Sequence, residues 1–355
     1  MAPTMSAVEE LQNVGFATAV TVERLLQDRK AQAALARSVV IVDEAGMLSG
    51  RQMSELLQLA ERSSARLVFC GDTKQIQSVE AGDALRVLEK ESRLKSVSLL
   101  EVQRQTDRPY RQAIEELRRN PEKGFERLEQ IGAVREIAST DRAEVVAAAY
   151  TESQAQRNRK GQPASTLVVC ATHAEIERVT EAIRAIRRRD GRLGESRQVG
   201  KHVSLGWTSA QKCDLRNYRT GQVIGFHRAV KGIAKHECLE VIRTNEKGVV
   251  ACNGSGEERT ITRKQILAFD VFERRQIEVA RGDRLLLTAN RRGQGLRVTN
   301  GEIVDVHCVD VRGQIHLEDG RTVPPDYRYF THGYALRRTA ARESRLMQKT
   351  ESFRS

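Results

Sequence analysis

Acidic residues follow an apolar run near the start of the chain, and their spacing suits nucleotide hydrolysis. Val39–Val42 reads as a strand buried on both faces and leads directly into Asp43 and Glu44. In a parallel α/β sheet, ligands bind at the carboxyl ends of the strands. We therefore expect Asp43 to hold Mg²⁺ and Glu44 to orient and deprotonate the attacking water. A surface Asp-Glu pair that only ends a strand is the alternative.

Two later segments could complete such a site. A second apolar run, 67–70, ends in Gly71-Asp72, and Gln75 follows shortly after it. A glutamine there could bond the terminal phosphate or the attacking water. A third apolar run leads into the segment EVQRQ, where Arg104 could stabilise charge on the transferring phosphoryl group. Taken alone, either segment could be an ordinary turn or a solvated side chain.

The elements that must position these residues follow the pattern of an α/β protein. Helical spacing of apolar residues between the first two runs predicts strand, helix, strand, and thus a parallel sheet with crossover helices. A polar stretch at 151–163 is followed by a second strand–helix unit, whose helix begins at Thr172.

The character of the sequence changes after residue 200. Short alternating runs such as 222–227 and 302–306 are separated by Gly and Asn, and Asn300-Gly301 is a hairpin-turn signal. We expect a small antiparallel, β-barrel-like insertion at 201–325. No repeat with a period of about 20–50 residues is evident.

The composition limits the class of protein. The 355 residues suffice for about two or three domains. The net charge of +12 suits a polyanionic partner, most commonly nucleic acid. Six cysteines without a CxxC pair argue against disulfides. No run approaches the ~20 apolar residues of a membrane span, and we expect a cytoplasmic protein.

The three motifs together are far more specific than any one of them. DEAGML after a strand, GDTKQIQSV after the next, and then QRQ resemble the RecD-like branch of superfamily 1 DNA helicases, in particular the helicase part of TraI/TrwC-type conjugative relaxases. Nearly the whole chain takes part. Its first 26 residues resemble an early DNA-contacting motif, 166–184 the opening of the second motor domain, and 282–306 a small inserted barrel.

The resemblance implies an α/β fold of two RecA-like (P-loop NTPase) domains, both incomplete, with the β-barrel insertion in the second. The expected ranges are 1–150 for the first domain, 151–200 for the start of the second, 201–325 for the insertion, and 326–355 for a remnant of the second domain with a divergent basic tail.

The resemblance also implies the partners and the site. The function would be ATP-driven translocation on single-stranded DNA in conjugative plasmid transfer, with ATP and Mg²⁺ as cofactors and other parts of a conjugative relaxase as possible partners. Nucleotide binding would fall to Asp43, Glu44, Gln75 and Arg104, of which the last three would be catalytic. Contacts with DNA would come from Pro3, Thr4, Thr21 and Thr172.

The sequence departs from this family in two ways. It holds no G-x-x-x-x-G-K-[ST] loop ahead of Pro3, and the segment 331–336 resembles the start of a late coupling motif that does not continue. We therefore expect a fragment, truncated at both ends, that is poorly stable, inactive towards ATP by itself and weakly bound to DNA. A non-enzymatic remnant or a nucleic-acid-binding module is the alternative. The arginines at 184–197 would either be a solvated helix end or face the DNA.

Overall fold

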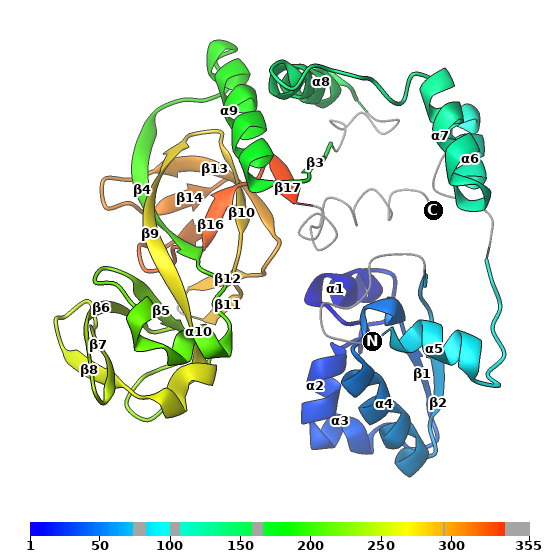
Figure 1. Ribbon diagram of the computed structural model, residues 1–355, viewed down its shortest axis with the longest axis horizontal. Helices are drawn as coiled ribbons and strands as arrows, with labels where there is room; N and C mark the ends of the chain where they lie inside the picture. Colours follow the sequence, from blue (N-terminus) through cyan, green and yellow to red (C-terminus); the bar gives the residue numbers. More distant parts are fainter. Residues whose placement is uncertain (74–82, 100–106, 158–165, 294, 338–355) are drawn as a thin grey trace. The chain divides into compact units, whose positions relative to one another are not determined.

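The computed structural model describes residues 1–73, 83–99, 107–157, 166–293 and 295–337 (Figure 1). The fold is mixed α/β, as the sequence predicted at that level. The chain divides into two compact units, Met1–Ile176 together with Leu336–Ser355, and Glu177–Ala335. The tail predicted to be divergent lies mostly outside the described residues. None of the helices that the structure describes is long and apolar enough to cross a membrane.

The first unit contains the predicted strand, helix and strand. β1 (Val39–Val42) pairs in parallel with β2 (Arg66–Phe69), and α4 (Gly50–Ser63) crosses between them. A capping box at Ser49 starts α4, which packs its apolar side chains on the sheet. The expectation that β1 is buried on both faces was wrong. Val40 and Val42 are buried, whereas Val39 is 62% exposed, because α4 and its neighbours cover one face only within the described residues.

Helices make up most of the rest of this unit. They are α1 (Met5–Asn13), α2 (Val22–Gln27), α3 (Arg29–Ala33), η1 (Ala45–Met47), α5 (Ala84–Glu91), α6 (Arg108–Arg119), α7 (Pro121–Gln130) and α8 (Arg142–Ala155). α6 and α7 form a tight hairpin, since a Cβ on Gly124 would lie only 2.2 Å from the Leu117 Cα. A further strand, β3 (Val168–Cys170), pairs with β17 (Ala335–Arg337) and leads into α9 (His173–Arg189).

The second unit is rich in strands and opens with β4 (Ser196–Ser204). After α10 (Ser209–Cys213) and η2 (Leu215–Asn217), its first sheet uses β5 (Val223–Phe226), β6 (Cys238–Asn245), β7 (Gly248–Cys252), β8 (Glu258–Ile261), η3 (Arg263–Ala268) and the long β9 (Phe269–Ala280). The strand order is β4-β9-β5-β6-β7-β8, and all these neighbours are antiparallel.

The second sheet of this unit repeats that order. It consists of β10 (Arg284–Leu287), β13 (Ile303–Val309), β14 (Ile315–Leu317), β15 (Thr322–Val323) and β16 (Phe330–His332), arranged β16-β10-β13-β14-β15. The hairpin of β11 (Arg291–Gly293) and β12 (Leu296–Val298) lies in the connection between β10 and β13. Asn300-Gly301 is a turn, as predicted, but it joins strands of different sheets instead of closing a hairpin.

The two sheets agree in register as well as in order. Ile224 pairs with Leu239 and Val271, and Leu285 pairs with Val304 and His332 in the same way. In both sheets the pairing between the second and third strands shifts register at the same point. Each set of five strands also begins with a glycine of positive φ, Gly221 or Gly282. The N–H of this glycine donates a hydrogen bond to a carbonyl of the second strand of its set. We call 221–272 the first module and 282–332 the second module.

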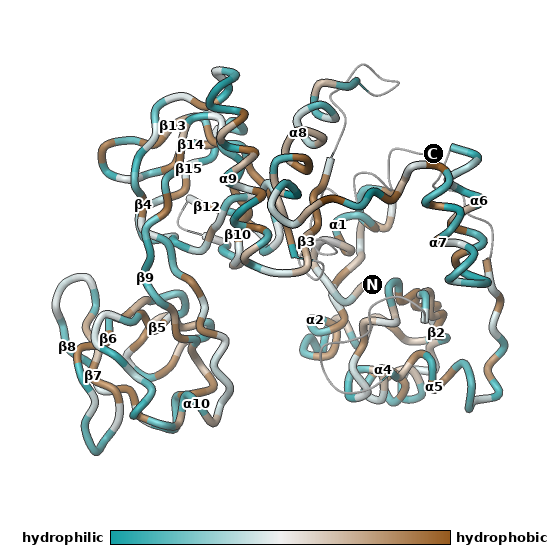
Figure 2. Tube along the Cα trace, turned by 45° about the horizontal axis from the view of Figure 1, so that its top comes forward, coloured by the Kyte–Doolittle hydropathy of each residue, from teal (hydrophilic) through white to brown (hydrophobic). Residues whose placement is uncertain are grey.

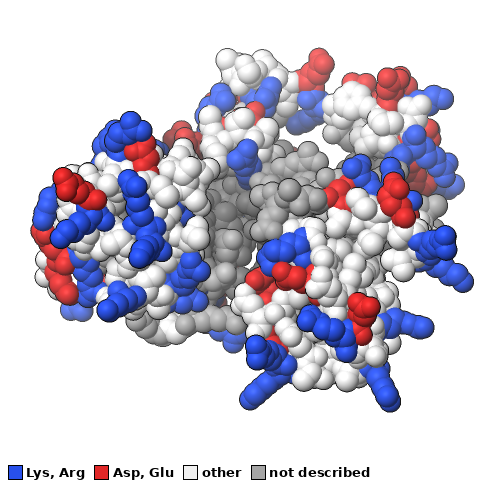
Figure 3. Space-filling view, turned by 60° about the horizontal axis from the view of Figure 1, so that its bottom comes forward, with Lys and Arg blue, Asp and Glu red and all other residues white. Residues whose placement is uncertain are grey.

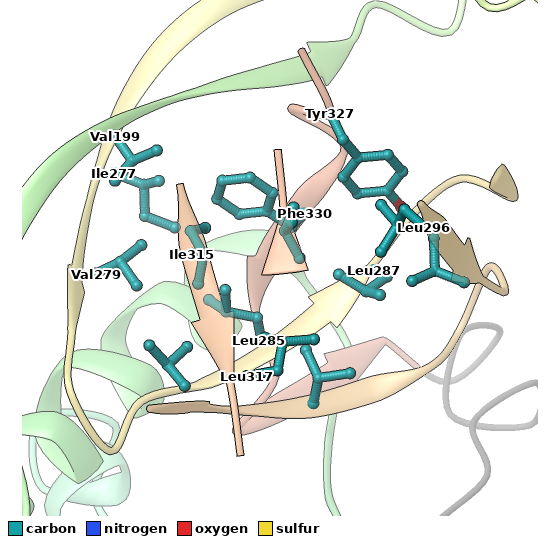
Figure 4. Close-up of a cluster of buried hydrophobic side chains, with 14 residues drawn as sticks. Val199, Ile277, Val279, Leu285, Leu287, Leu296, Ile315, Leu317, Tyr327 and Phe330 are labelled. Atoms are coloured by element: carbon teal, nitrogen blue, oxygen red, sulfur yellow. The ribbon is translucent and has the colours of Figure 1, made fainter. Parts of the chain in front are cut away.

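Each module has its own hydrophobic core. In the second, apolar side chains from β4, β9, β10 and β14 meet the rings of Tyr327 and Phe330 (Figure 4). Hydrophilic stretches lie along β4 and much of β9 as well as at turns, because only some residues of these strands are buried (Figure 2). The predicted β-barrel-like insertion is not confirmed. Both sheets are small and open, and they end on the edge strands β8 and β15.

Candidate nucleotide and nucleic-acid site

Asp43 and Glu44 lie in the turn at the carboxyl end of β1, and both are partly buried. Glu44 adopts φ 51° and ψ 37°, the left-handed conformation that residues with a side chain rarely adopt. Such a conformation costs about 1–3 kcal/mol and persists only where the surrounding structure enforces it. This turn is therefore held in its shape by its neighbours.

The neighbour that holds it is the turn after β2. The Ala45 N–H donates to the Cys70 carbonyl at 2.8 Å, next to the last pairing of the two strands. Gly71 lies directly against this turn, because a Cβ there would come within 3.1 Å of the Gly46 nitrogen. The structure thus brings Asp43, Glu44 and the Gly71-Asp72 turn together. Two predicted catalytic residues, Gln75 and Arg104, lie outside the described residues.

The N-terminal segment is connected to the same strand end. The Asp43 N–H donates to the Met1 carbonyl at 2.9 Å. One residue on, Ala2 forms a parallel bridge with Thr21. Pro3 and Thr4 follow immediately and Thr21 is paired with Ala2, so three of the four predicted DNA contacts lie on or beside the N-terminal segment that contacts the end of β1. The fourth, Thr172, lies at the start of α9.

The three threonines share a structural role that the sequence analysis missed. Thr4 caps α1, and Thr21 caps α2 by accepting the Arg24 N–H. Thr172 accepts the Glu175 N–H at 3.2 Å, while the Glu175 carboxylate accepts the Thr172 N–H at 3.2 Å. A hydroxyl that accepts one hydrogen bond still has a proton to donate. Capping is therefore compatible with a contact to a phosphate oxygen.

The acidic groups at the end of β1 suit a hard cation that brings other ligands with it. The described residues hold no group of three His, Cys, Asp or Glu side chains that would bind a metal alone. Mg²⁺ at a nucleotide site typically takes one or two carboxylates, with waters and phosphate oxygens filling its remaining positions. Asp43 beside Glu44 fits that description. The Asp43 charge also adds to partial burial in raising the pKa of the Cys70 thiol.

The arginines after residue 183 are largely engaged inside the second unit. Arg184 donates from Nε and Nη2 to the two carboxylate oxygens of Asp283, both at 3.0 Å. Arg187 donates to the Gly282 carbonyl, and Arg188 pairs with Glu278 at 2.9 Å. These three residues dock α9 on β9 and on the turn between β9 and β10. For Arg184 and Arg187, neither a solvated helix end nor a free DNA-facing surface describes the structure, whereas the Arg188 side chain stays 52% exposed.

Comparison with known proteins finds similarity over part of the chain. A family model described as an AAA domain matches residues 1–139. The probable conjugal transfer protein TraA of Sinorhizobium fredii (strain NBRC 101917 / NGR234) is 42% identical over 52 residues, and the conjugal transfer protein TraA of Rhizobium radiobacter is 40% identical over 52. The matched stretch covers 15% of this chain and only 5% of either TraA protein.

Solved structures similar to this chain include two of the Pif1 helicase from Bacteroides. One is in complex with ADP-AlF3 and single-stranded DNA, at 13% identity and a TM-score of 0.34. The other is bound to single-stranded DNA, at 14% identity and a TM-score of 0.33. Each comparison covers 96% of this chain and 72% of the Pif1 chain. Scores this low add no weight to the assignment.

The matches to an AAA domain and to TraA proteins support the predicted resemblance, and the AAA match spans seven of the eight predicted site residues, all except Thr172. The role of each of these residues stays a prediction. What sequence reasoning could not supply was the contact between the two motif turns. Its signal was available in retrospect as the small residues Gly46 and Gly71, one after each strand.

Proposed function

We propose that this chain forms motor parts of an ATP-dependent helicase or translocase that acts on single-stranded DNA during conjugative plasmid transfer. Its two strand–helix units would belong to two RecA-like domains, and other parts of a conjugative relaxase would be its partners. The observation that carries the proposal is the packing of the Asp43-Glu44 turn on the Gly71-Asp72 turn.

In this proposal the acidic turn supplies the hydrolytic chemistry. Asp43 would hold Mg²⁺ together with the phosphates of ATP, and the metal would neutralise charge on the transferring group. Glu44 would orient the attacking water and accept its proton. The left-handed backbone at Glu44 supports this role, because strained residues concentrate at functional sites. Gln75 and Arg104 would bind the terminal phosphoryl group.

DNA would be held by the N-terminal segment that contacts the end of the same strand. Pro3 and Thr4 closely follow Met1, whose carbonyl accepts the Asp43 N–H, and Thr21 is bridged to Ala2. A shift of the acidic turn on nucleotide binding would therefore reach the DNA contacts through one hydrogen bond. Thr172, on α9, would contribute a contact from the second motor domain.

The test is ATP hydrolysis with and without single-stranded DNA. The sequence holds no G-x-x-x-x-G-K-[ST] segment, so its residues lack the main anchor for a triphosphate. We expect this chain alone to bind DNA but to hydrolyse ATP only at the background rate. Fused behind a strand and phosphate-binding loop from a conjugative relaxase helicase, it should show DNA-stimulated turnover.

The control variant is Glu44→Gln in that fusion, which keeps size and polarity but removes the base. Turnover should fall by about 100-fold or more, since general base catalysis contributes roughly 10²–10⁴-fold. DNA binding should not change. A fusion that binds DNA and nucleotide yet never hydrolyses ATP would instead favour the second candidate, a nucleic-acid-binding module without enzymatic activity, which the net charge of +12 also suits.

A further inference from the structure

The two modules carry the same kind of charge at the same point in their fold. The connection between the first two strands of the first module, residues 227–236, contains Arg228, Lys231, Lys235 and two histidines, and no acidic residue. The equivalent connection in the second module, residues 288–301, contains three arginines and again no acidic residue. We call these segments the first loop and the second loop. Their sequences differ, but their charge is alike.

The cations of the first loop are exposed and not engaged within the unit. Arg228, Lys231 and Lys235 are all exposed, and no ion pair joins them to a carboxylate among the described residues. Arginines on the strands of this unit behave differently. Arg243 pairs with Glu258 at 2.8 Å, and Arg274 pairs with Glu240 at 3.0 Å. The loop cations are therefore available to an external anion.

The two loops approach each other at one short segment of the second module. Just after the first loop, the Cys238 Sγ at the start of β6 lies 3.1 Å from the Tyr329 hydroxyl. Within the second loop, Arg291 pairs with Asp326 at 2.8 Å. Residues 326–329 thus contact the second loop and the strand start that directly follows the first loop. In agreement with this proximity, Arg291 adds to burial and Lys235 in lowering the pKa of His236.

The surface around this unit carries more basic than acidic side chains on the face seen in Figure 3. We propose that the first and second loops together bind the phosphate backbone of a single-stranded nucleic acid. This inference rests on the proposed function for the kind of polyanion, and it adds a contact outside the predicted motor residues. Contacts of this type position a strand without reading its sequence.

The experiment compares two pairs of substitutions that remove the same charge. The loop variant is Lys231→Gln with Arg297→Gln, one exposed cation from each loop. The control variant is Lys247→Gln with Arg312→Gln, exposed cations from the β6–β7 and β13–β14 turns. These turns are equivalent in the two modules, so the control matches net charge, exposure and fold. Binding of a fluorescent oligothymidine to the full chain is measured over a range of salt concentrations.

For single strands, the slope of log affinity against log salt is about −0.7 per phosphate contact. We expect the loop variant to bind more weakly at low salt and to have a slope shallower by about 1.4. The control variant should match the unaltered chain. Equal weakening of both variants would mean general charge attraction and would overturn the proposal. So would a chain that does not bind the oligonucleotide at all.

Two further measurements complete the design. Circular dichroism melting of all variants shows whether a loss of binding reflects a loss of folding. The four substituted positions are exposed, so we expect no change in the melting temperature. Competition with polyglutamate separates nucleic acid from an acidic protein partner, and a competitor as effective as DNA would overturn the assignment. The motor proposal is tested separately, by ATP turnover of the phosphate-loop fusion. If that turnover is absent, the salt dependence of oligonucleotide binding still tests the role of the two loops.

Discussion

At the scale of single residues, the repeat shows which backbone positions are constrained. His236 and Gly301 occupy equivalent positions in the two modules, and both have a positive φ, 69° and 84°. In each module the N–H of this residue donates a hydrogen bond to the carbonyl of the last residue of the first strand, Phe226 or Leu287. Glycine adopts this conformation without strain, and only the second of the two positions carries a glycine.

This difference predicts opposite effects of two substitutions. His236→Gly should leave stability unchanged or raise it by up to ~1 kcal/mol, because relief of roughly 1–2 kcal/mol of left-handed strain exceeds the added chain entropy. Gly301→Ala should lower stability by ~1–2 kcal/mol for the same reason. Urea unfolding followed by the fluorescence of Trp207 measures both. A destabilised His236→Gly variant would show that the histidine ring makes a contact worth more than the strain.

The sequence could predict the acidic site residues but not their conformation. Asp43 and Glu44 were found from their position after an apolar run. The left-handed φ of Glu44 depends on the packing of Gly71 against Gly46, two turns that are distant in sequence. Likewise, the threonines were identified by resemblance, whereas their capping roles depend on where each helix begins.

At the scale of elements, the docking of α9 depends on one fully buried carboxylate. Asp283 is 0% exposed and accepts hydrogen bonds from Arg184, from the Tyr334 hydroxyl at 2.9 Å and from the Ala280 N–H at 2.7 Å. It therefore joins α9, the β9–β10 turn and the segment after β16. A buried charge is stable only when its partners are present.

Asp283→Asn should consequently be strongly destabilising. The substitution leaves the buried Arg184 guanidinium with only the partly exposed Glu278 carboxylate, at 3.3 Å, as its counter-charge, and breaking a buried pair in this way costs about 3–5 kcal/mol. Asp305→Asn is the matched control, since Asp305 pairs with Arg284 at 3.0 Å but is itself 54% exposed in its side chain. An exposed pair contributes about 1 kcal/mol or less. Chemical denaturation of both variants tests this, and similar losses would contradict the assigned role of Asp283.

Strands were predictable one at a time, but their assembly was not. The alternating runs near 222–227, 238–243, 284–288 and 302–306 became β5, β6, β10 and β13. Alternation identifies which face of a strand is buried, and it says nothing about which strands pair. The last strand of each module pairs with its first, yet the sheets stay open at β8 and β15, so the barrel-like insertion is not confirmed, although its antiparallel character was right.

At the scale of the whole molecule, the strand-rich unit contains histidines that folding keeps neutral. Burial, opposed in part by the Asp283 charge, lowers the pKa of His332 to about 4. Burial, together with Arg274 and Arg328, also lowers the pKa of His202 to about 4. The unfolded chain takes up these protons near pH 6.5, whereas the folded chain resists them until about pH 4.

The resulting stability is therefore present above about pH 6.5 and is lost as the pH falls towards 4. Each histidine contributes a slope of at most about 1.4 kcal/mol per pH unit in that range. His332→Gln should reduce the slope, and His307→Gln, whose side chain is 61% exposed, should not. Urea unfolding at pH 7, 6 and 5 measures it. A slope that His332→Gln leaves unchanged would refute the assignment.

The repeat itself was not visible in the sequence for a physical reason. The modules share register, bulge position and the opening glycine, but register is fixed by backbone pairing, which many apolar residues satisfy equally well. Ile224 and Leu285 are equivalent, as are Leu239 and Val304, without being identical. In addition, the second loop is longer than the first. Equivalent residues before and after the loops are therefore separated by different numbers of residues along the chain, and no constant repeat period results.

That difference in loop length shows where the modules tolerate insertions. The first loop leaves and re-enters its sheet beside the pair Gly225–Cys238, and the longer second loop does so beside Leu286–Ile303, with the flanking pairs unchanged. A hairpin has therefore been accommodated at this junction without altering the sheet. The same junction in the first module is a suitable point for inserting a peptide tag or a fluorescent reporter, and a sequence grafted from the second loop is the natural first choice.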